Sequence, residues 1–245
     1  MRTYKLTVAY DGSRYQGWQR QPDTKMTIQG ILEQAVLEEK GFPVKIDGSG
    51  RTDGGVHAKG QAASLVLPGK IDEEEFRNAL NARLPDDIRI MQVQLMKNGF
   101  HARYSAKGKK YVYTVDTGEK GDVFQRKYAY HFPGNLNLQV MRDAADILEG
   151  RHDFCAFTDR KTDEMTTIRT IHRIEIVRQG NLLYIEYDGD GFMYHMVRIL
   201  TGTILEAGSG RRKSGEIRRL LYNGERTDAG FLAPACGLML KEVYY

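Results

Sequence analysis

Nearly the same order of predicted elements occurs twice along this chain of 245 residues, and this order restricts the fold more than any other feature. In the first half, apolar periodicity predicts a strand, a helix, two strands, a helix and a strand at residues 4–8, 28–36, 44–46, 65–67, 72–80 and 88–93. Gly41 follows the first helix where a C-cap belongs, and Asp72 with Glu75 resembles a capping box for the second.

The second half nearly repeats this order. A strand, a helix, the two strands of a hairpin, two helices and a final strand are predicted at residues 111–115, 138–148, 174–176, 183–185, 194–207, 215–223 and 238–240. Gly180-Asn181 is the turn of the hairpin. The pattern predicts an α+β fold of two tandem ferredoxin-like (RRM-like) βαββαβ halves with mostly antiparallel sheets. We place an N-terminal domain at residues 1–105 and a C-terminal domain at residues 106–245.

A glycine-rich segment, residues 48–60, lies between the two middle strands of the first half. Five of its residues are glycine, nearly all others are polar or charged, and its one carboxylate is Asp53. Glycine lets a backbone take positive φ angles and approach a ligand closely. A fold does not need a long charged loop here, whereas a site for a charged substrate does. The blander alternative is a long glycine hairpin with an exposed acid.

Other chemistries do not fit the spacing of this segment. It lacks the Gly-Lys-Ser/Thr ending of a P-loop, the dinucleotide-binding pattern, and the Gly-x-Ser-x-Gly of a nucleophile elbow. Asp53 and His57 stand four residues apart, but a metal site would need a third ligand and a helix to align them. We therefore expect no metal and no organic cofactor.

Composition limits the cellular setting. The chain is 41% hydrophobic and 28% charged, as in a soluble globular protein. Cys155 and Cys236 show neither metal nor redox spacing, which favours a reducing compartment. The N-terminus has no apolar signal region, and no apolar run is long enough to span a bilayer. We expect a cytoplasmic protein.

Basic residues gather in three places. Residues 97–115 hold five Lys or Arg and no acid, residues 211–219 hold a second group, and a third surrounds aromatic residues near the N-terminus. Cations beside aromatic rings suit a phosphate backbone with unstacked bases, although each cluster alone could be a solvated face. The candidate RNA contacts are Arg14, Arg20, His57, Lys109, Lys110, Arg211, Arg212 and Lys213.

Six blocks of the chain closely resemble motifs of the tRNA pseudouridine synthase A family and occur in the same order as in that family. They are Tyr10-Asp11-Gly12-Ser13-Arg14-Tyr15-Gln16-Gly17-Trp18-Gln19-Arg20-Gln21, Gly50-Arg51-Thr52-Asp53-Gly54-Gly55-Val56-His57-Ala58, Phe100-His101-Ala102-Arg103-Tyr104-Ser105-Ala106, Lys109-Lys110-Tyr111-Val112-Tyr113, Phe192-Met193-Tyr194-His195-Met196-Val197-Arg198 and Gly237-Leu238-Met239-Leu240. Ser49 and Gly54 stand where the family's loop is expected to have alanine. The resemblance implies two ferredoxin-like halves side by side, with the active site in a central RNA-binding cleft.

The resemblance also implies an isomerase that converts uridine to pseudouridine at positions 38, 39 and 40 of the tRNA anticodon stem-loop, acting as a homodimer. By similarity, Asp53 is the catalytic aspartate, Arg198 pairs with it, Tyr111 stacks on the flipped uracil, and Leu238 or Leu240 seals the pocket. Arg51 is a candidate contact to phosphate or base. Two alternatives remain: a non-catalytic RRM-like RNA-binding protein, although no stretch matches the RNP1 pattern, and a nucleoside-processing glycosidase, which normally needs two facing carboxyls.

Overall fold

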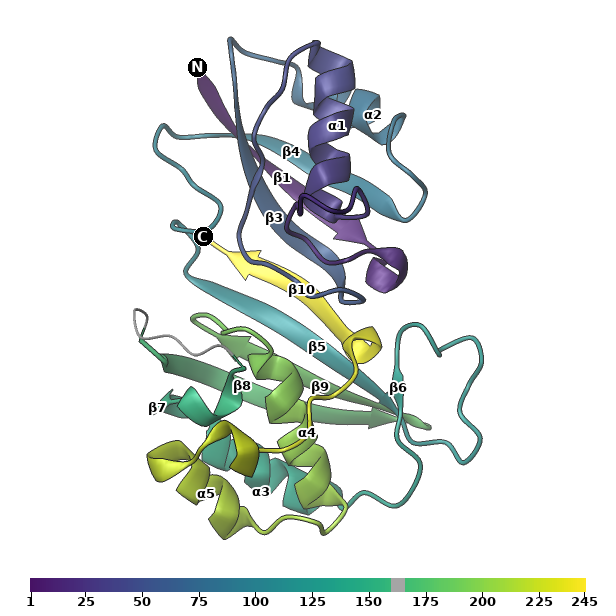
Figure 1. The fold of residues 1–245 in the computed structure, drawn as a ribbon, viewed down its shortest axis with the longest axis vertical. Helices are drawn as coiled ribbons and strands as arrows, with labels where there is room; N and C mark the ends of the chain where they lie inside the picture. Colours follow the sequence, from purple (N-terminus) through teal and green to yellow (C-terminus); the bar gives the residue numbers. More distant parts are fainter. Residues whose placement is uncertain (160–165) are drawn as a thin grey trace. The chain divides into compact units, whose positions relative to one another are not determined.

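The computed structural model describes residues 1–159 and 166–245 and divides the chain into two compact units (Figure 1). The first unit comprises Met1–Lys107 together with Met239–Tyr245, and the second comprises Gly108–Leu238. The domains at residues 1–105 and 106–245 stay a prediction.

In the first unit, helices alternate with strands of one sheet. Its elements are β1 (Arg2–Tyr10), the short 3-10 helix η1 (Gly12–Arg14), α1 (Ile28–Lys40), β2 (Asp47–Gly48), β3 (His57–Leu67), α2 (Glu73–Asn81), β4 (Ile88–Met96) and β10 (Leu238–Tyr244). The strands follow the order β4-β1-β3-β10, with β2 also beside β3. The pairs β1–β3, β1–β4 and β2–β3 are antiparallel, and β10 runs parallel to β3.

Local sequence signals account for most of these elements. Tyr4, Leu6 and Val8 alternate along β1 and are all fully buried, as period-2 burial requires. Helix α1 ends at Gly41, which takes the left-handed conformation with φ 77°. Helix α2 begins after Asp72, whose carboxylate accepts a 2.8 Å hydrogen bond from the backbone N–H of Glu75. The strand, the glycine that ends α1 and the N-cap bond from Glu75 to Asp72 are confirmed.

The predicted strand at residues 44–46 is wrong. Strand β2 contains Asp47–Gly48 alone, and Ile46 lies before it in an irregular segment. The backbone N–H of Ile46 donates to Glu33 (3.1 Å), and its carbonyl accepts from the Gln29 side chain (3.0 Å). Side chains of α1 therefore satisfy the backbone groups that a strand would have paired with a neighbour.

The second unit consists of further strands and a layer of helices. Its elements are β5 (Gly108–Asp116), β6 (Tyr130–His131), α3 (Leu138–Leu148), β7 (Gly150–Asp153), η2 (Cys155–Phe157), β8 (Ile168–Gln179), β9 (Leu182–Gly189), α4 (Met196–Gly208), α5 (Ser214–Asn223), η3 (Arg226–Asp228) and η4 (Ala235–Gly237). The strand order is β5-β9-β8-β7, all antiparallel, with β6 parallel to β5. The short strands β6 and β7 were not predicted.

Helix packing builds the core of the second unit. Helix α3 packs against α4, α5 and β8. Helix α4 is buried along nearly its whole length, which explains why its sequence has few polar residues. The predicted hairpin is confirmed, because β8 and β9 join at Gly180, whose φ is 61°. The mixed α+β architecture with mostly antiparallel sheets is likewise confirmed. Among residues 1–159 and 166–245, no helix has the length and apolar character needed to cross a membrane.

Candidate active site

The glycine-rich segment forms a shorter loop than its sequence indicates. Strand β2 pairs with β3 in the register Asp47↔Ser64 and Gly48↔Ala63, and β3 already begins at His57. The loop is therefore residues 49–56, which we call the aspartate loop, and the last four residues of the glycine-rich segment belong to a strand. Paired strands hold both ends of the loop, as expected for a site that needs fixed geometry.

Backbone hydrogen bonds attach the aspartate loop to the segment that follows β1. The backbone N–H of Trp18 donates to the carbonyl of Thr52 (3.0 Å), and the N–H of Gly55 donates to the carbonyl of Tyr15 (3.3 Å). The hydroxyl of Tyr10 forms a 2.8 Å hydrogen bond with the Thr52 hydroxyl, in the interior. Burial raises the pKa of Tyr10, so this phenol stays protonated and neutral. These bonds fix Thr52, the residue before Asp53, and so fix the backbone on the N-terminal side of Asp53.

Two glycines permit this attachment. Gly17 has φ 92°, and a Cβ built on it would lie 2.6 Å from the carbonyl oxygen of Thr52. A Cβ on Gly48 would lie 2.5 Å from the indole of Trp18, which is itself 1% exposed. Both contacts are closer than a side chain allows, so these positions require glycine. Gly17 and Trp18 belong to the family-like N-terminal block and Gly48 to the glycine-rich segment, but the sequence alone indicated no individual role for them.

Asp53 lies in the turn of the aspartate loop. Its backbone carbonyl accepts from the N–H of Val56 (3.2 Å), and its side chain is partly exposed. Thr52 before it is buried, whereas Arg51 is exposed. A carboxylate on a fixed loop can act as a nucleophile or as a general base.

His57 has surroundings that its sequence position did not indicate. Its ring is 5% exposed, and Nδ1 accepts a 3.1 Å hydrogen bond from the backbone N–H of Gly12. The same nitrogen lies 3.2 Å from a carboxylate oxygen of Asp11. The ring joins the start of β3 to η1, and a contact with RNA would require it to move.

Three further candidates lie in the second unit. Arg198, near the start of α4, is partly buried and donates from Nε to the carbonyl of Ala233 (2.7 Å). Tyr111 on β5 is 8% exposed, and its ring meets Phe192 edge-on, with centroids 5.4 Å apart and planes at 87°. Leu238 at the start of β10 is buried. These side chains are held in defined orientations within their unit.

The predicted basic clusters are not isolated from acids. Four of their cations pair with acids that lie elsewhere in the sequence: Arg14 with Asp87, Arg20 with Glu33, Lys110 with Glu186, and Arg212 with Glu206. The N–O distances are 2.5, 3.2, 2.9 and 2.8 Å in that order. The absence of acids from residues 97–115 therefore does not hold in space, because Lys110 pairs with Glu186 on β9. Arg211 and Lys213 are exposed, and Lys109 is partly exposed.

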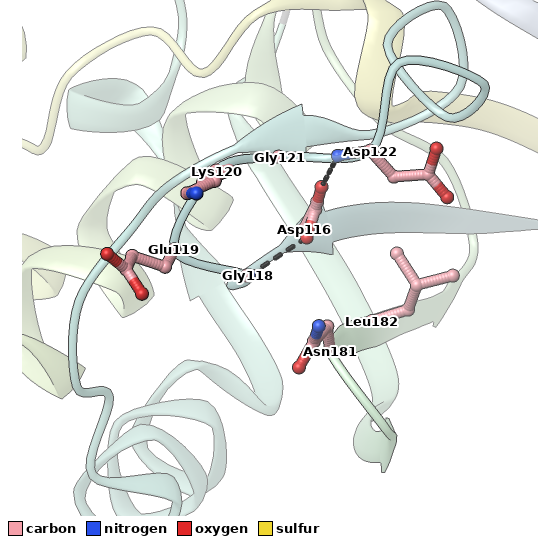
Figure 2. Close-up of a pocket in the computed structure, with 8 residues that line it drawn as sticks. All are labelled: Asp116, Gly118, Glu119, Lys120, Gly121, Asp122, Asn181 and Leu182. Carbon is pink, nitrogen blue, oxygen red and sulfur yellow. Dashed lines mark hydrogen bonds between the residues drawn. The ribbon is translucent and has the colours of Figure 1, made fainter.

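A hollow in the second unit contains none of the predicted site residues. Figure 2 shows its lining: Asp116, Gly118, Glu119, Lys120, Gly121, Asp122, Asn181 and Leu182. Its volume is about 230 Å³. The buried carboxylate of Asp116 accepts from the backbone N–H groups of Gly118 (2.9 Å) and Asp122 (2.7 Å). These bonds fold a turn onto the end of β5, which is a structural role.

Metal ligands are not grouped in the part of the chain that the structure describes. There, no group of three or more His, Cys, Asp and Glu side chains could hold an ion. The expectation that the protein uses no metal or cofactor stays a prediction.

Comparisons with known proteins agree with the motifs. A family model described as tRNA pseudouridine synthase matches residues 6–105 and 144–245. Three relatives called tRNA pseudouridine synthase A come from Clostridium botulinum (41% identical over 245 residues, covering 100% of both chains), Lacticaseibacillus casei (44% over 248 residues, 100% of both) and Bacillus subtilis (44% over 243 residues, 98% of both).

A solved structure, the crystal structure of a Cbf5-Nop10-Gar1 complex, contains a chain with a TM-score of 0.39 and 12% identity, over 96% of this chain and 57% of that one. A likeness this weak carries no argument. The family model spans both units, and the relatives match from end to end. On this evidence, the chain belongs to the tRNA pseudouridine synthase family.

Proposed function

We propose that this protein isomerises uridine to pseudouridine at positions 38, 39 and 40 of the tRNA anticodon stem-loop, with Asp53 as the reacting carboxylate. As a member of its family, the chain is a tRNA-modifying isomerase. The observation that carries the proposal is the aspartate loop. It holds one carboxylate between glycines, fixed by paired strands and by the segment around Trp18.

The reaction needs little beyond a placed carboxylate. The C1′–N1 bond breaks, the uracil turns, and C5 bonds to C1′. C5 loses a proton and N1 gains one, so no atoms or electrons are gained or lost overall. Asp53 can begin this sequence by attacking the sugar or the base, or by removing a proton from the sugar. Because uridine in a stem is stacked and paired, it must be flipped out before Asp53 reaches it.

Side chains of the second unit are assigned supporting roles. Arg198 is proposed to keep Asp53 ionised and oriented, since a cation beside a carboxylate favours its charged form. The Nε bond to Ala233 supports this by fixing one edge of the guanidinium. Tyr111 is proposed to stack on the flipped uracil, and its edge contact with Phe192 supports a fixed ring plane. Leu238 is proposed to seal the pocket.

The wider assignments are proposals as well. The strand order β4-β1-β3, with β2 beside β3 and all pairs antiparallel, supports a ferredoxin-like domain at residues 1–105, and we propose a second at residues 106–245. We also propose that the protein works as a homodimer on tRNA in the cytoplasm. The exposed Arg51, Arg211 and Lys213 are its proposed phosphate contacts.

Chromatography of tRNA digested to nucleosides tests the function. The protein is incubated with an unmodified transcript and with a matched transcript carrying cytidine at positions 38–40. Pseudouridine should form in the first transcript and not in the second. Unchanged uridine would indicate a non-catalytic RNA-binding protein, and released free uracil would indicate a glycosidase. Pseudouridine in the cytidine transcript would refute the proposed positions.

A further inference from the structure

Helix α4, which carries Arg198, begins at an unusual residue. Among residues 1–159 and 166–245, His195 is the one non-glycine residue with a positive φ, at 63°. The left-handed conformation costs a residue that has a Cβ about 1–2 kcal/mol, because the Cβ comes close to the following carbonyl oxygen. Such a conformation persists where the surroundings fix it. His195 is the N-cap of α4, and its ring does not cap the helix.

Two side chains hold the ring of His195: the carboxylate of Asp159 and the ring of Tyr194. Nδ1 of His195 lies 2.5 Å from one carboxylate oxygen of Asp159, and the ring of Tyr194 stacks on the imidazole with centroids 3.7 Å apart. The other oxygen of Asp159 accepts from Nε of Arg226 (2.6 Å). Partial burial acts to raise the pKa of Asp159, but the hydrogen bonds from His195 and Arg226 hold it below its usual value. Asp159 is therefore a carboxylate between two partners.

Arg226 begins a segment that returns to α4, residues 226–233, which we call the strap. Its Nη1 donates to the carbonyl of Gly230 (3.1 Å), whose own N–H donates to the Thr203 hydroxyl on α4 (3.0 Å). At the end of the strap, Ala233 exchanges two hydrogen bonds with Arg198. Its N–H donates to the Arg198 carbonyl (3.3 Å), and its carbonyl accepts from the guanidinium (2.7 Å).

Asp159 thus joins the two supports of Arg198. One support is the first turn of α4, where His195 stands three residues before Arg198. The other is the strap, which Arg226 begins and which ends on the guanidinium through Ala233. We propose that Asp159 is a positioning residue for the uridine isomerisation: by joining His195 to Arg226, it holds the Arg198 guanidinium in one orientation. This rests on the proposed function, and it assigns Asp159 to the chemical step and not to tRNA binding.

The test compares Asp159→Ala with wild type in single-turnover pseudouridine formation. Because misplacing a group by about 1 Å can slow a reaction about 100-fold, the rate should fall about 10- to 100-fold. The Kd for tRNA should stay within about twofold, because Asp159 is assigned to the chemical step and not to a contact with tRNA. His195→Asn is the second variant. Asparagine tolerates the left-handed conformation, so this change removes the ring without forcing a new backbone.

A double-mutant cycle separates positioning from general stability. If Asp159 acts through Arg198, Asp159→Ala should change the rate by less than about twofold when Arg198 is already Lys. The control is Glu175→Ala, which breaks the Arg173–Glu175 ion pair (3.0 Å) of the same unit. The control should keep the wild-type rate.

Three results would count against Asp159 as a positioning residue or against the proposed function. An active wild type with an unchanged rate in both Asp159→Ala and His195→Asn would overturn this inference alone. Equal rate losses with and without the Arg198→Lys change would also overturn it, because they indicate a merely structural role. A wild type that makes no pseudouridine would overturn the proposed function and this inference with it.

Discussion

The aspartate loop of the first unit and the start of α4 in the second unit are held by different physical means. Backbone hydrogen bonds, one neutral Tyr–Thr pair and two close glycine contacts hold the loop. Around α4, the carboxylate of Asp159 joins two side chains that can carry positive charge. The close backbone contacts of the aspartate loop are sensitive to the size of a side chain. The interactions of Asp159 are sensitive to protonation and to removal of its charge. The two sites should therefore fail in different ways.

Among the changes that compare these two regions, Gly17→Ala is expected to have the largest effect. The new Cβ would lie 2.6 Å from the Thr52 carbonyl oxygen, so the aspartate loop must shift. Single-turnover pseudouridine formation should fall on the order of 100-fold. Gly41→Ala is the matched control, because Gly41 also has a positive φ (77°) but nothing within 4 Å of its added Cβ. It should cost about 1–2 kcal/mol of stability and leave the rate unchanged. Equal rates in the two variants would show that the close contact of Gly17 with Thr52 does not hold the aspartate loop in its active geometry.

A pair of buried tyrosines sharpens the comparison. Tyr10 and Tyr187 each form a 2.8 Å hydrogen bond to a threonine hydroxyl, Thr52 in the loop and Thr201 on α4. Replacing either tyrosine with Phe should lower the free energy of unfolding by about 1–2 kcal/mol, measured by urea denaturation. Tyr10→Phe alone should also slow the reaction about fivefold, as roughly 1 kcal/mol on a barrier does. Similar rates for both variants would show that the Thr52 contact has no special bearing on Asp53.

The dependence of stability on pH should distinguish the interactions of Asp159 from the neutral Tyr10–Thr52 pair. The pKa of Asp159 is lowered in the folded protein, so its ionised form contributes stability above the unfolded value of about 3.9. That contribution is lost as the pH falls through the lower, folded pKa. The stability difference between wild type and Asp159→Ala should therefore be constant above pH ~5 and shrink below pH ~4. The corresponding difference for Tyr10→Phe should not change over this range, and a parallel decline would contradict the contrast.

The smallest effect concerns neighbouring arginines after α4. Arg211 is exposed and lies over the ring of Phe132 (5.8 Å), while Arg212 is paired with Glu206. Arg211→Gln should reduce the log–log salt slope of tRNA binding by about one unit, the value for one lost phosphate contact. Arg212→Gln should leave the slope unchanged and lower stability instead. Equal slopes in both variants and wild type would place the RNA contacts elsewhere.

Much of the fold could be predicted because its signals are local. Period-2 burial in β1, the left-handed Gly41 after α1, the Asp72 cap of α2 and the Gly180 hairpin depend on residues close in sequence. The failures share a cause. The predicted strand at residues 44–46 does not form because α1 side chains take the backbone hydrogen bonds of Ile46. Arg14 and Lys110 of the basic clusters pair with acids that are distant in sequence, Asp87 and Glu186.

The site was predictable in part for the same reason. Asp53 could be singled out as the one acid in a glycine-rich segment, but its attachment could not. The contacts of Gly17 and Trp18 with the aspartate loop join residues more than thirty positions apart. Neither Asp159 nor Arg226 has a local signal, because their partners are set by the return of the strap onto α4.

The central claim is that the carboxylate of Asp53 performs the isomerisation. It is tested most directly by tritium release from tRNA carrying C5-labelled uridine, with Asp53→Asn compared against wild type. Asp47→Asn serves as the control, since Asp47 lies just before the loop in β2 and pairs with Lys45 (2.7 Å). Asp53→Asn should bind tRNA nearly as wild type does and release no tritium, because the amide keeps the shape and loses both nucleophile and base. Asp47→Asn should stay active. Substantial tritium release by Asp53→Asn would contradict the account.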